Sequence, residues 1–140
     1  MTPDPMPPGY EALLAYLESR LPRPVDRQDD ADGIRFLAGE PPEVIVTLTP
    51  SVVVVDEFAG EWETPGRFRL VPRRIGVLHW PHLPENDLLD TLAALLAGAR
   101  AARRSRYRVC GACDRSVPPE WMHDTGLCQA CVAAEGGTIH

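Results

Sequence analysis

The fold class of this chain follows from residues 43–58, which read EVIVTLTPSVVVVDEF. Valine, isoleucine and threonine dominate these residues, and β-branched side chains favour strands. Pro50-Ser51 divides the run into two segments of strand length, Glu43–Thr49 and Ser51–Phe58. Val52–Val55 are four consecutive apolar residues without alternation, which indicates a strand that is buried on both faces and central in a sheet.

Short apolar segments of the same kind lie on both sides of this pair. They are Gly33–Ala38 before it and Arg67–Trp80 after it, the latter interrupted by Pro72. Because turns containing proline or glycine separate the segments, they predict four or five antiparallel strands. The polar stretch Arg23–Asp32 predicts a loop.

Two helices flank the predicted sheet. Apolar residues at helical spacing precede Pro22 and Pro24 and indicate the first: Tyr10, Leu13, Leu14, Leu17 and Leu21. The second is a long helix that opens at Pro84–Asp87 and extends to about Arg104, with an apolar stripe of Leu88, Leu92, Leu95, Leu96 and Ala99. Packing both helices on one face of the sheet buries both stripes, so the sequence predicts an α+β fold.

Charge divides the 140 residues into three parts. The chain has 20 acidic residues, 14 arginines and no lysine, for a formal net charge of −6. Residues 1–98 contain 16 acids and 8 arginines, residues 99–109 contain five arginines and no acid, and residues 110–140 contain four acids and one arginine. An acidic segment is therefore joined through a basic one to the part that carries the cysteines.

The sequence indicates a cytoplasmic protein without membrane association. Its longest apolar run, Val44–Val55, is interrupted by polar residues and is shorter than the ~20 residues that cross a bilayer. The first ten residues contain four prolines and no basic residue, unlike a secretory leader. In the cytoplasm thiols stay reduced, which favours metal binding over disulfides.

Two cysteine pairs give the strongest chemical signal. Cys110 and Cys113 are followed, after fourteen residues, by Cys128 and Cys131, in the pattern C-x2-C-x14-C-x2-C. Four thiolates at such spacings are typical ligands of tetrahedral zinc, and they leave no coordination position for a catalytic water. We therefore predict one structural Zn²⁺. Iron uses the same ligands, and His123, between the pairs, is an alternative ligand.

The second pair differs from the first in its local structure. Residues 126–135 predict a turn that opens a short helix, which ends at Gly136-Gly137. A pair on a turn followed by a pair in the first turn of a helix resembles the treble-clef group of zinc fingers, whereas a zinc ribbon places both pairs on hairpin turns. The resemblance covers residues 108–137, and we recognise no family for residues 1–107.

These observations predict four parts of the chain. They are a proline-rich tail (1–8), an α+β body (9–104), a basic connector (105–109) and a four-cysteine zinc finger (110–140). The complete expected fold is a helix, a four- or five-stranded antiparallel sheet, a long helix and a small C-terminal zinc finger.

The arginines of residues 99–109, here called the arginine collar, are the main indication of nucleic-acid binding. The collar and its tyrosine comprise Arg100, Arg103, Arg104, Arg106, Tyr107 and Arg108. Arginines beside an aromatic ring bind phosphates and stack on bases. The same cations can instead complement the dipole of the long helix or pack against the acidic body. Because the acidic body repels a polyanion, nucleic-acid binding is the second hypothesis.

An acidic cluster around a tryptophan is the candidate surface for a protein partner. It comprises Asp56, Glu57, Glu61, Trp62 and Glu63. Such a surface suits a basic protein. His79 and His82 flank Trp80 and are the main candidates for an enzymatic pocket, but we find no motif that joins a nucleophile to a base. We therefore predict a non-enzymatic interaction protein, either an adaptor, a regulator or an immunity-like inhibitor, with a nucleic-acid-binding regulator as the alternative.

Overall fold

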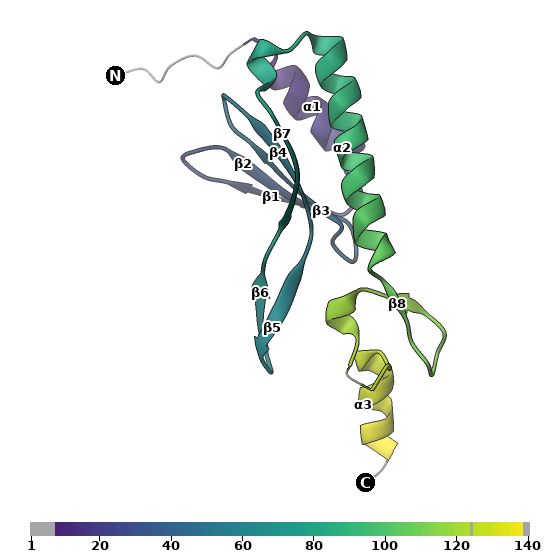
Figure 1. The fold of residues 1–140 in the computed structure, drawn as a ribbon. Coiled ribbons are helices and arrows are strands. Elements are labelled where there is room, and N and C mark those ends of the chain that lie inside the picture. The colour runs from purple at the N-terminus through teal and green to yellow at the C-terminus, as the bar shows by residue number, and fades with distance from the viewer. Residues whose placement is uncertain (1–7, 124, 139–140) are drawn as a thin grey trace.

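The computed structural model describes residues 8–123 and 125–138 (Figure 1). The first part of the chain contains α1 (Tyr10–Arg20), β1 (Val25–Asp29), β2 (Ile34–Ala38), β3 (Val44–Leu48), β4 (Val53–Glu57), β5 (Gly60–Thr64), β6 (Arg67–Leu70), β7 (Arg73–Leu78), η1 (Trp80–His82) and α2 (Glu85–Ser105). The C-terminal part contains β8 (Arg108–Val109), β9 (Ser116–Val117), η2 (Pro119–Trp121) and α3 (Gln129–Thr138). This order of a helix, an antiparallel sheet, a long helix and a cysteine-bearing unit confirms the predicted α+β fold class.

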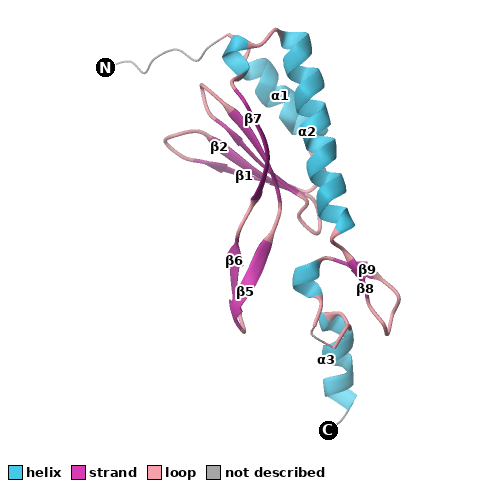
Figure 2. Cartoon of the chain, viewed as in Figure 1, coloured by secondary structure: helices cyan, strands magenta, loops and turns pink. Residues whose placement is uncertain are grey.

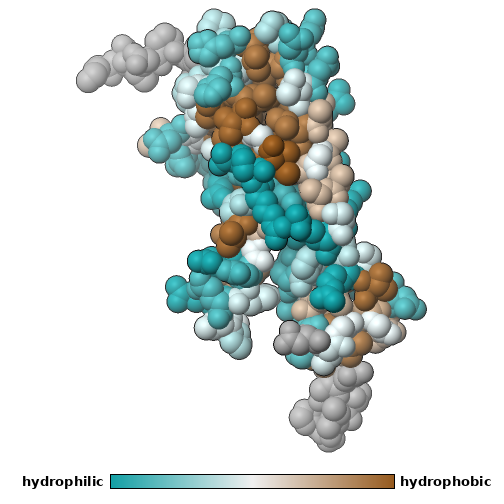
Figure 3. All heavy atoms as spheres, in the orientation of Figure 1, coloured by the Kyte–Doolittle hydropathy of each residue, from teal (hydrophilic) through white to brown (hydrophobic). Residues whose placement is uncertain are grey.

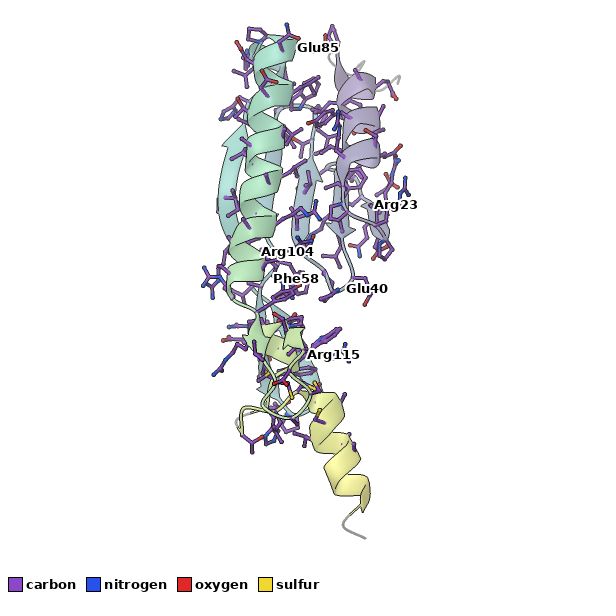
Figure 4. All side chains as sticks on the ribbon, turned by 90° about the vertical axis from the view of Figure 1, so that its right-hand side faces the viewer. Arg23, Glu40, Phe58, Glu85, Arg104 and Arg115 are labelled. Carbon is purple, nitrogen blue, oxygen red and sulfur yellow. The ribbon has the colours of Figure 1, made fainter. Side chains whose placement is uncertain are left out.

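The main sheet has five antiparallel strands in the order β1-β2-β3-β4-β7. Its register aligns Ile34, Leu48, Val53 and Leu78 across one face. Figure 4 shows that α1 and α2 both cover this face. Their leucines complete a single core with the inward residues of the sheet. Among the described residues, no helix is both long enough and apolar enough to span a bilayer.

The valine run predicted to be central forms an interior strand. β4 lies between β3 and β7, and Val53 and Val55 are fully buried against the helices. Val54, on the opposite face, is only half-buried. The middle strand of the sheet is β3, because β1 adds a strand on the far side that the sequence did not predict.

The predicted loop at Arg23–Asp32 is wrong, because residues 25–29 form β1. β1 pairs with β2 along its whole length, yet only Val25 is partly buried and the other four residues are exposed. An outer strand at the margin of the helical cover needs backbone pairing but little apolar burial. Its sequence, VDRQD, therefore shows no apolar alternation.

A second unpredicted strand, β5, pairs with β6 in a two-stranded ribbon that extends towards the C-terminal unit (Figure 2). The predicted strand Arg67–Trp80 is divided into β6 and β7 around Val71-Pro72. The register between β4 and β7 shifts at Val55/Asp56. Such a bulge increases the local bend and twist of a strand pair. The ribbon thus continues β4 and β7 beyond the five-stranded sheet.

The C-terminal unit has a small buried cluster of its own. Cys110, Val117 and Cys128 form it, separately from the core of the sheet and helices. We call residues 9–104 the body and residues 110–140 the finger, and these boundaries stay a prediction. Most of the predicted tail (1–8) lies outside the described residues. α3 continues through the predicted stop at Gly136-Gly137 to Thr138, so that helix end is a correction.

Two glycines provide a matched test of this packing. A Cβ on Gly33 would lie 2.2 Å from the backbone oxygen of Leu48, whereas a Cβ on Gly98, in the exposed middle of α2, meets nothing within 4 Å. We expect Gly33→Ala to lower the free energy of unfolding by about 1–3 kcal/mol through overpacking. Gly98→Ala should raise it by about 0.5–1 kcal/mol because alanine favours the helix. Urea unfolding of both variants measures the difference; equal effects would contradict the β2–β3 register.

Candidate metal centre

The first cysteine pair lies at the tip of the β8–β9 hairpin. Cys110 follows β8, and its backbone N–H donates to the carbonyl oxygen of Arg115 at 2.9 Å. The N–H of Asp114 donates to the carbonyl oxygen of Cys110 at 3.0 Å, and Asp114 has a left-handed φ of 59°. These contacts close residues 110–115 into a tight turn.

The second cysteine pair lies at the start of α3. The chain returns to the first pair through η2 and an isolated bridge between Met122 and Cys128. The N–H of Val132 donates to the carbonyl oxygen of Cys128 at 3.0 Å, so Cys128 precedes the helix and Cys131 lies in its first turn. The expectation that this pair opens a helix is therefore confirmed.

The four sulfur atoms form one cluster. The Sγ atoms of Cys110 and Cys131 are 3.7 Å apart, those of Cys113 and Cys128 are 3.9 Å apart, and all four lie within 4.8 Å of one another. Four sulfurs at ~2.3 Å from a tetrahedral zinc ion are about 3.8 Å apart. The cluster can therefore hold a metal ion. Within residues 8–123 and 125–138, no other group of three or more histidine, cysteine or carboxylate ligands does so.

The surroundings of the sulfurs favour a thiolate at one position and oppose it at another. Backbone N–H groups, first that of Cys128 and then those of Cys113 and Ala112, lower the pKa of Cys110 to about 6. Hydrogen bonding with the side chains of Cys128, Cys110 and Cys113 raises the pKa of Cys131 to about 12. Four neighbouring thiols therefore resist full deprotonation until a cation offsets the accumulated negative charge.

His123 lies outside the sulfur cluster. Its Nδ1 atom is 3.2 Å from the hydroxyl of Thr125 and 3.3 Å from the backbone nitrogen of Thr125, and its side chain is exposed. The alternative in which His123 replaces a cysteine ligand therefore gains no support from the geometry.

Arg103 attaches the finger to the body. Its side chain is only 2% exposed, and its guanidinium forms a two-pronged ion pair with the carboxylate of Glu120 in η2. Its Nε atom also donates to the carbonyl oxygen of Pro42 at 3.0 Å. The guanidinium lies 4.9 Å from the ring centroid of Phe58 and 5.4 Å from that of Tyr107. Figure 4 shows Phe58 beside the lower end of α2, where the finger begins.

Glu120 also binds groups on both sides through its backbone. Its carbonyl oxygen accepts hydrogen bonds from the indole Nε1 of Trp62 in β5 at 2.9 Å and from the side chain of Gln129 in α3 at 3.1 Å. One residue between the cysteine pairs thus contacts α2, the β5–β6 ribbon and α3.

The rest of the arginine collar is mostly occupied by the body. Arg100 and Arg104 donate to the two carboxylate oxygens of Glu43 at 2.8 and 2.7 Å. Arg106 donates to Glu57 at 2.8 Å. Only Arg108 among the five collar arginines is exposed without an ion pair to a described residue. The collar is therefore largely neutralised by Glu43, Glu57 and Glu120.

The candidate acidic surface is divided between two environments. The side chain of Glu57 is 2% exposed and that of Asp56 is 12% exposed and paired with Arg74. Glu61 and Glu63 lie on the ribbon, where both pair with Arg69 but remain accessible. Trp62 is 46% exposed and lines a cleft of about 630 Å³ between the ribbon tip and the finger, with Glu63 and Met122.

The candidate pocket at the two histidines is not lined by them. Trp80 is 2% exposed, and its indole Nε1 donates to the carbonyl oxygen of Thr49 at 2.8 Å. A cavity of about 280 Å³ beside it is lined largely by apolar residues such as Leu88, with neither His79 nor His82. Both histidines are exposed.

Sequence reasoning missed Glu43, Phe58 and Glu120, which organise the junction between body and finger. Because glutamate side chains are usually exposed, the local sequence does not mark Glu43 or Glu120 as buried. The partner of such a glutamate cannot be predicted from neighbouring residues, because Glu43 and Arg104, for example, are 61 residues apart in the chain.

Comparison with known proteins finds no matching family model, curated protein or solved structure.

We expect the purified chain to contain one metal ion held by the four cysteines. Cys113→Ser should lose it, whereas His123→Ala should keep one ion per chain. A strong chelator should unfold the finger and leave the body folded, because the finger buries too little apolar surface to fold alone. Elemental analysis and nuclear magnetic resonance spectra test both points. A full metal equivalent in Cys113→Ser would refute the four-cysteine site.

The Arg103–Glu120 pair should be worth more than a surface ion pair. Both side chains are largely buried, so removing either one leaves the other as an unpaired buried charge, at a cost of about 3–5 kcal/mol. We expect Arg103→Leu and Glu120→Leu to be strongly destabilising singly and less than additive together. Arg69→Leu, which breaks two exposed ion pairs, with Glu61 and Glu63, serves as the control with an effect within about 1 kcal/mol. A double-mutant cycle in urea measures the interaction free energy between the two side chains. A value near zero would contradict the conclusion that this pair attaches the finger to the body.

Proposed function

We propose that this chain is a non-enzymatic zinc-binding interaction protein. One structural Zn²⁺ bound by Cys110, Cys113, Cys128 and Cys131 folds the finger, and the acidic body binds a protein partner. The observation that carries the proposal is the closed sulfur cluster, fixed to the body by the buried Arg103–Glu120 pair. Such an assembly supports a surface that spans two structural units.

Zinc is the metal that best suits this site. All four ligand atoms are sulfur, their spacing matches a tetrahedron, and a reducing cytoplasm keeps thiols available. A hairpin-tip pair joined to a helix-start pair supports a treble-clef scaffold over a zinc ribbon. Four thiolates complete the coordination shell, so the ion stabilises structure and does not activate water. Metal analysis distinguishes zinc from iron.

The partner surface that we propose is the cleft between the ribbon and the finger. Trp62 is its centre, because the indole is both exposed and held in place by the Glu120 carbonyl oxygen and an edge contact with Phe68 at 5.2 Å. A pre-positioned tryptophan loses little entropy on binding and often dominates an interface. The accessible carboxylates of Glu61 and Glu63 favour a basic partner.

We prefer a protein partner to nucleic acid because most arginines of the collar already form ion pairs within the chain. Arg100, Arg104 and Arg106 already bind carboxylates of the body, and Arg103 is buried. A phosphate backbone would have to displace these intramolecular pairs and approach a chain of net charge −6. The adaptor, regulator and immunity-like roles all fit a basic protein partner in the cytoplasm.

Affinity capture from the native cell extract tests this proposal. We expect the tagged wild-type chain to retain a basic protein, and we expect this retention to be insensitive to nuclease treatment. Trp62→Ala and Glu63→Arg should weaken binding at least about tenfold, as for central interface residues. Trp121→Ala removes the other exposed tryptophan, which does not line the cleft, and should bind normally. Retention of nucleic acid alone would favour the collar hypothesis instead.

A further inference from the structure

The two outer strands of the five-stranded sheet differ sharply in character. β1 carries Asp26, Arg27, Gln28 and Asp29, all exposed, along one outer edge. Charged residues of this kind protect a sheet edge from pairing with another chain. The other outer strand, β7, ends in Ile-Gly-Val-Leu (75–78), and none of these residues is charged. One edge of the sheet is therefore protected and the other is not.

Exposed apolar side chains accompany the β7 edge. Val77 is 39% exposed, and Val71 and Leu83, on either side of β7 in the chain, are 42% and 37% exposed. Figure 3 shows hydrophobic residues gathered on the upper part of the molecule, in the region of β7 and the first half of α2. Within the part of the chain that the structure describes, no strand pairs with the outer edge of β7. An apolar, unpaired edge is a template for adding a strand.

The flank of α2 above β7 has small residues and one acid. A Cβ on Gly76 of β7 would lie 2.8 Å from the Cδ2 atom of Leu95, so the Leu95 side of α2 faces β7. Helical spacing places Asp87, Thr91 and Gly98 on the same flank. The small side chains beyond the apolar stripe leave room for another helix to approach closely over the extended sheet.

The two ends of the β7 edge carry opposite charges, basic at the start of β7 and acidic near its end. Arg73 begins β7 and is exposed, and it forms no ion pair with any described residue. The opposite end of β7 leads through η1 to the acidic start of α2, where Glu85 and Asp87 are also exposed and without an ion pair in the described range. An antiparallel partner strand of the same sequence would bring each Arg73 beside the acidic end of the other copy.

We propose that two copies of this chain associate through antiparallel pairing of their β7 strands. The contact is isologous, because the same edge serves both copies about a two-fold axis. It joins the two five-stranded sheets into one continuous sheet, with both α2 helices on the same face. The apolar residues 75–78 form the centre of the contact, and the Arg73–Asp87 pairs form its two ends. This contact lies apart from the Trp62 cleft, so it does not depend on the proposed partner or on the metal.

Sedimentation equilibrium of the full metal-loaded chain tests the proposal. We expect a dimer in the wild-type protein and a monomer in Val77→Lys, because lysine protects an edge strand. Val109→Lys is the matched control: Val109 is 62% exposed and lies in β8, outside the five-stranded sheet, so the dimer should persist. A wild-type chain that stays monomeric up to about 100 μM, where even weak dimers form, would overturn the proposal.

A charge exchange makes the test independent of folding defects. Arg73→Glu and Asp87→Arg should each raise the dimer dissociation constant about tenfold, because each places like charges together across the contact. The double variant restores opposite charges and should return the constant to within about threefold of the wild-type value. A purely structural role for either residue would not produce this recovery. A wild-type dimer that is insensitive to all of these substitutions would place the interface elsewhere and overturn the proposal.

Discussion

The structure depends on the burial of one arginine. Arg103 is 2% exposed at the C-terminal end of α2, where an isolated charge would be too costly to retain. The carboxylate of Glu120, the carbonyl oxygen of Pro42 and the ring faces of Phe58 and Tyr107 together make the position tenable. Pro42 precedes β3 and Phe58 follows β4. Tyr107 lies in the connector and Glu120 in the finger. Satisfying one guanidinium therefore fixes how four separate segments meet.

The uneven distribution of charge along the sequence reflects ion pairs that form at the junction of body and finger. The collar resembles an exposed basic patch in the sequence, but four of its five arginines pair with Glu43, Glu57 and Glu120 at the junction of body and finger. Neutralisation at the junction leaves the excess negative charge at more distant places, such as the start of α2. The net charge of each segment therefore does not show which of its charges remain accessible after the chain has folded.

Local sequence patterns predicted the elements whose causes are local. β2, β3 and β4 follow from apolar runs between turns, and the cysteine cluster follows from the spacing of its ligands. β1 was missed because an outer strand needs no apolar face, and β5 because its residues, GEWET, are mostly exposed and stabilised by pairing with β6. Glu43 and Glu120 could not be assigned because their partners are selected by the assembled fold, over separations of up to 61 residues for Glu43. The sequence thus predicted the cysteine cluster, which can hold a metal ion, and missed the contacts that attach the finger to the body.

Glu120 links the two sources of stability in the chain. The body folds by burying a large apolar core, whereas the finger has only a small cluster around its cysteines. Glu120 lies between the two cysteine pairs, so its position is defined only when the finger is folded. Its carboxylate then neutralises Arg103 and its carbonyl oxygen holds Trp62. The orientation of the exposed indole on the body is therefore coupled to the folding of the finger, through a single residue outside the cysteine cluster.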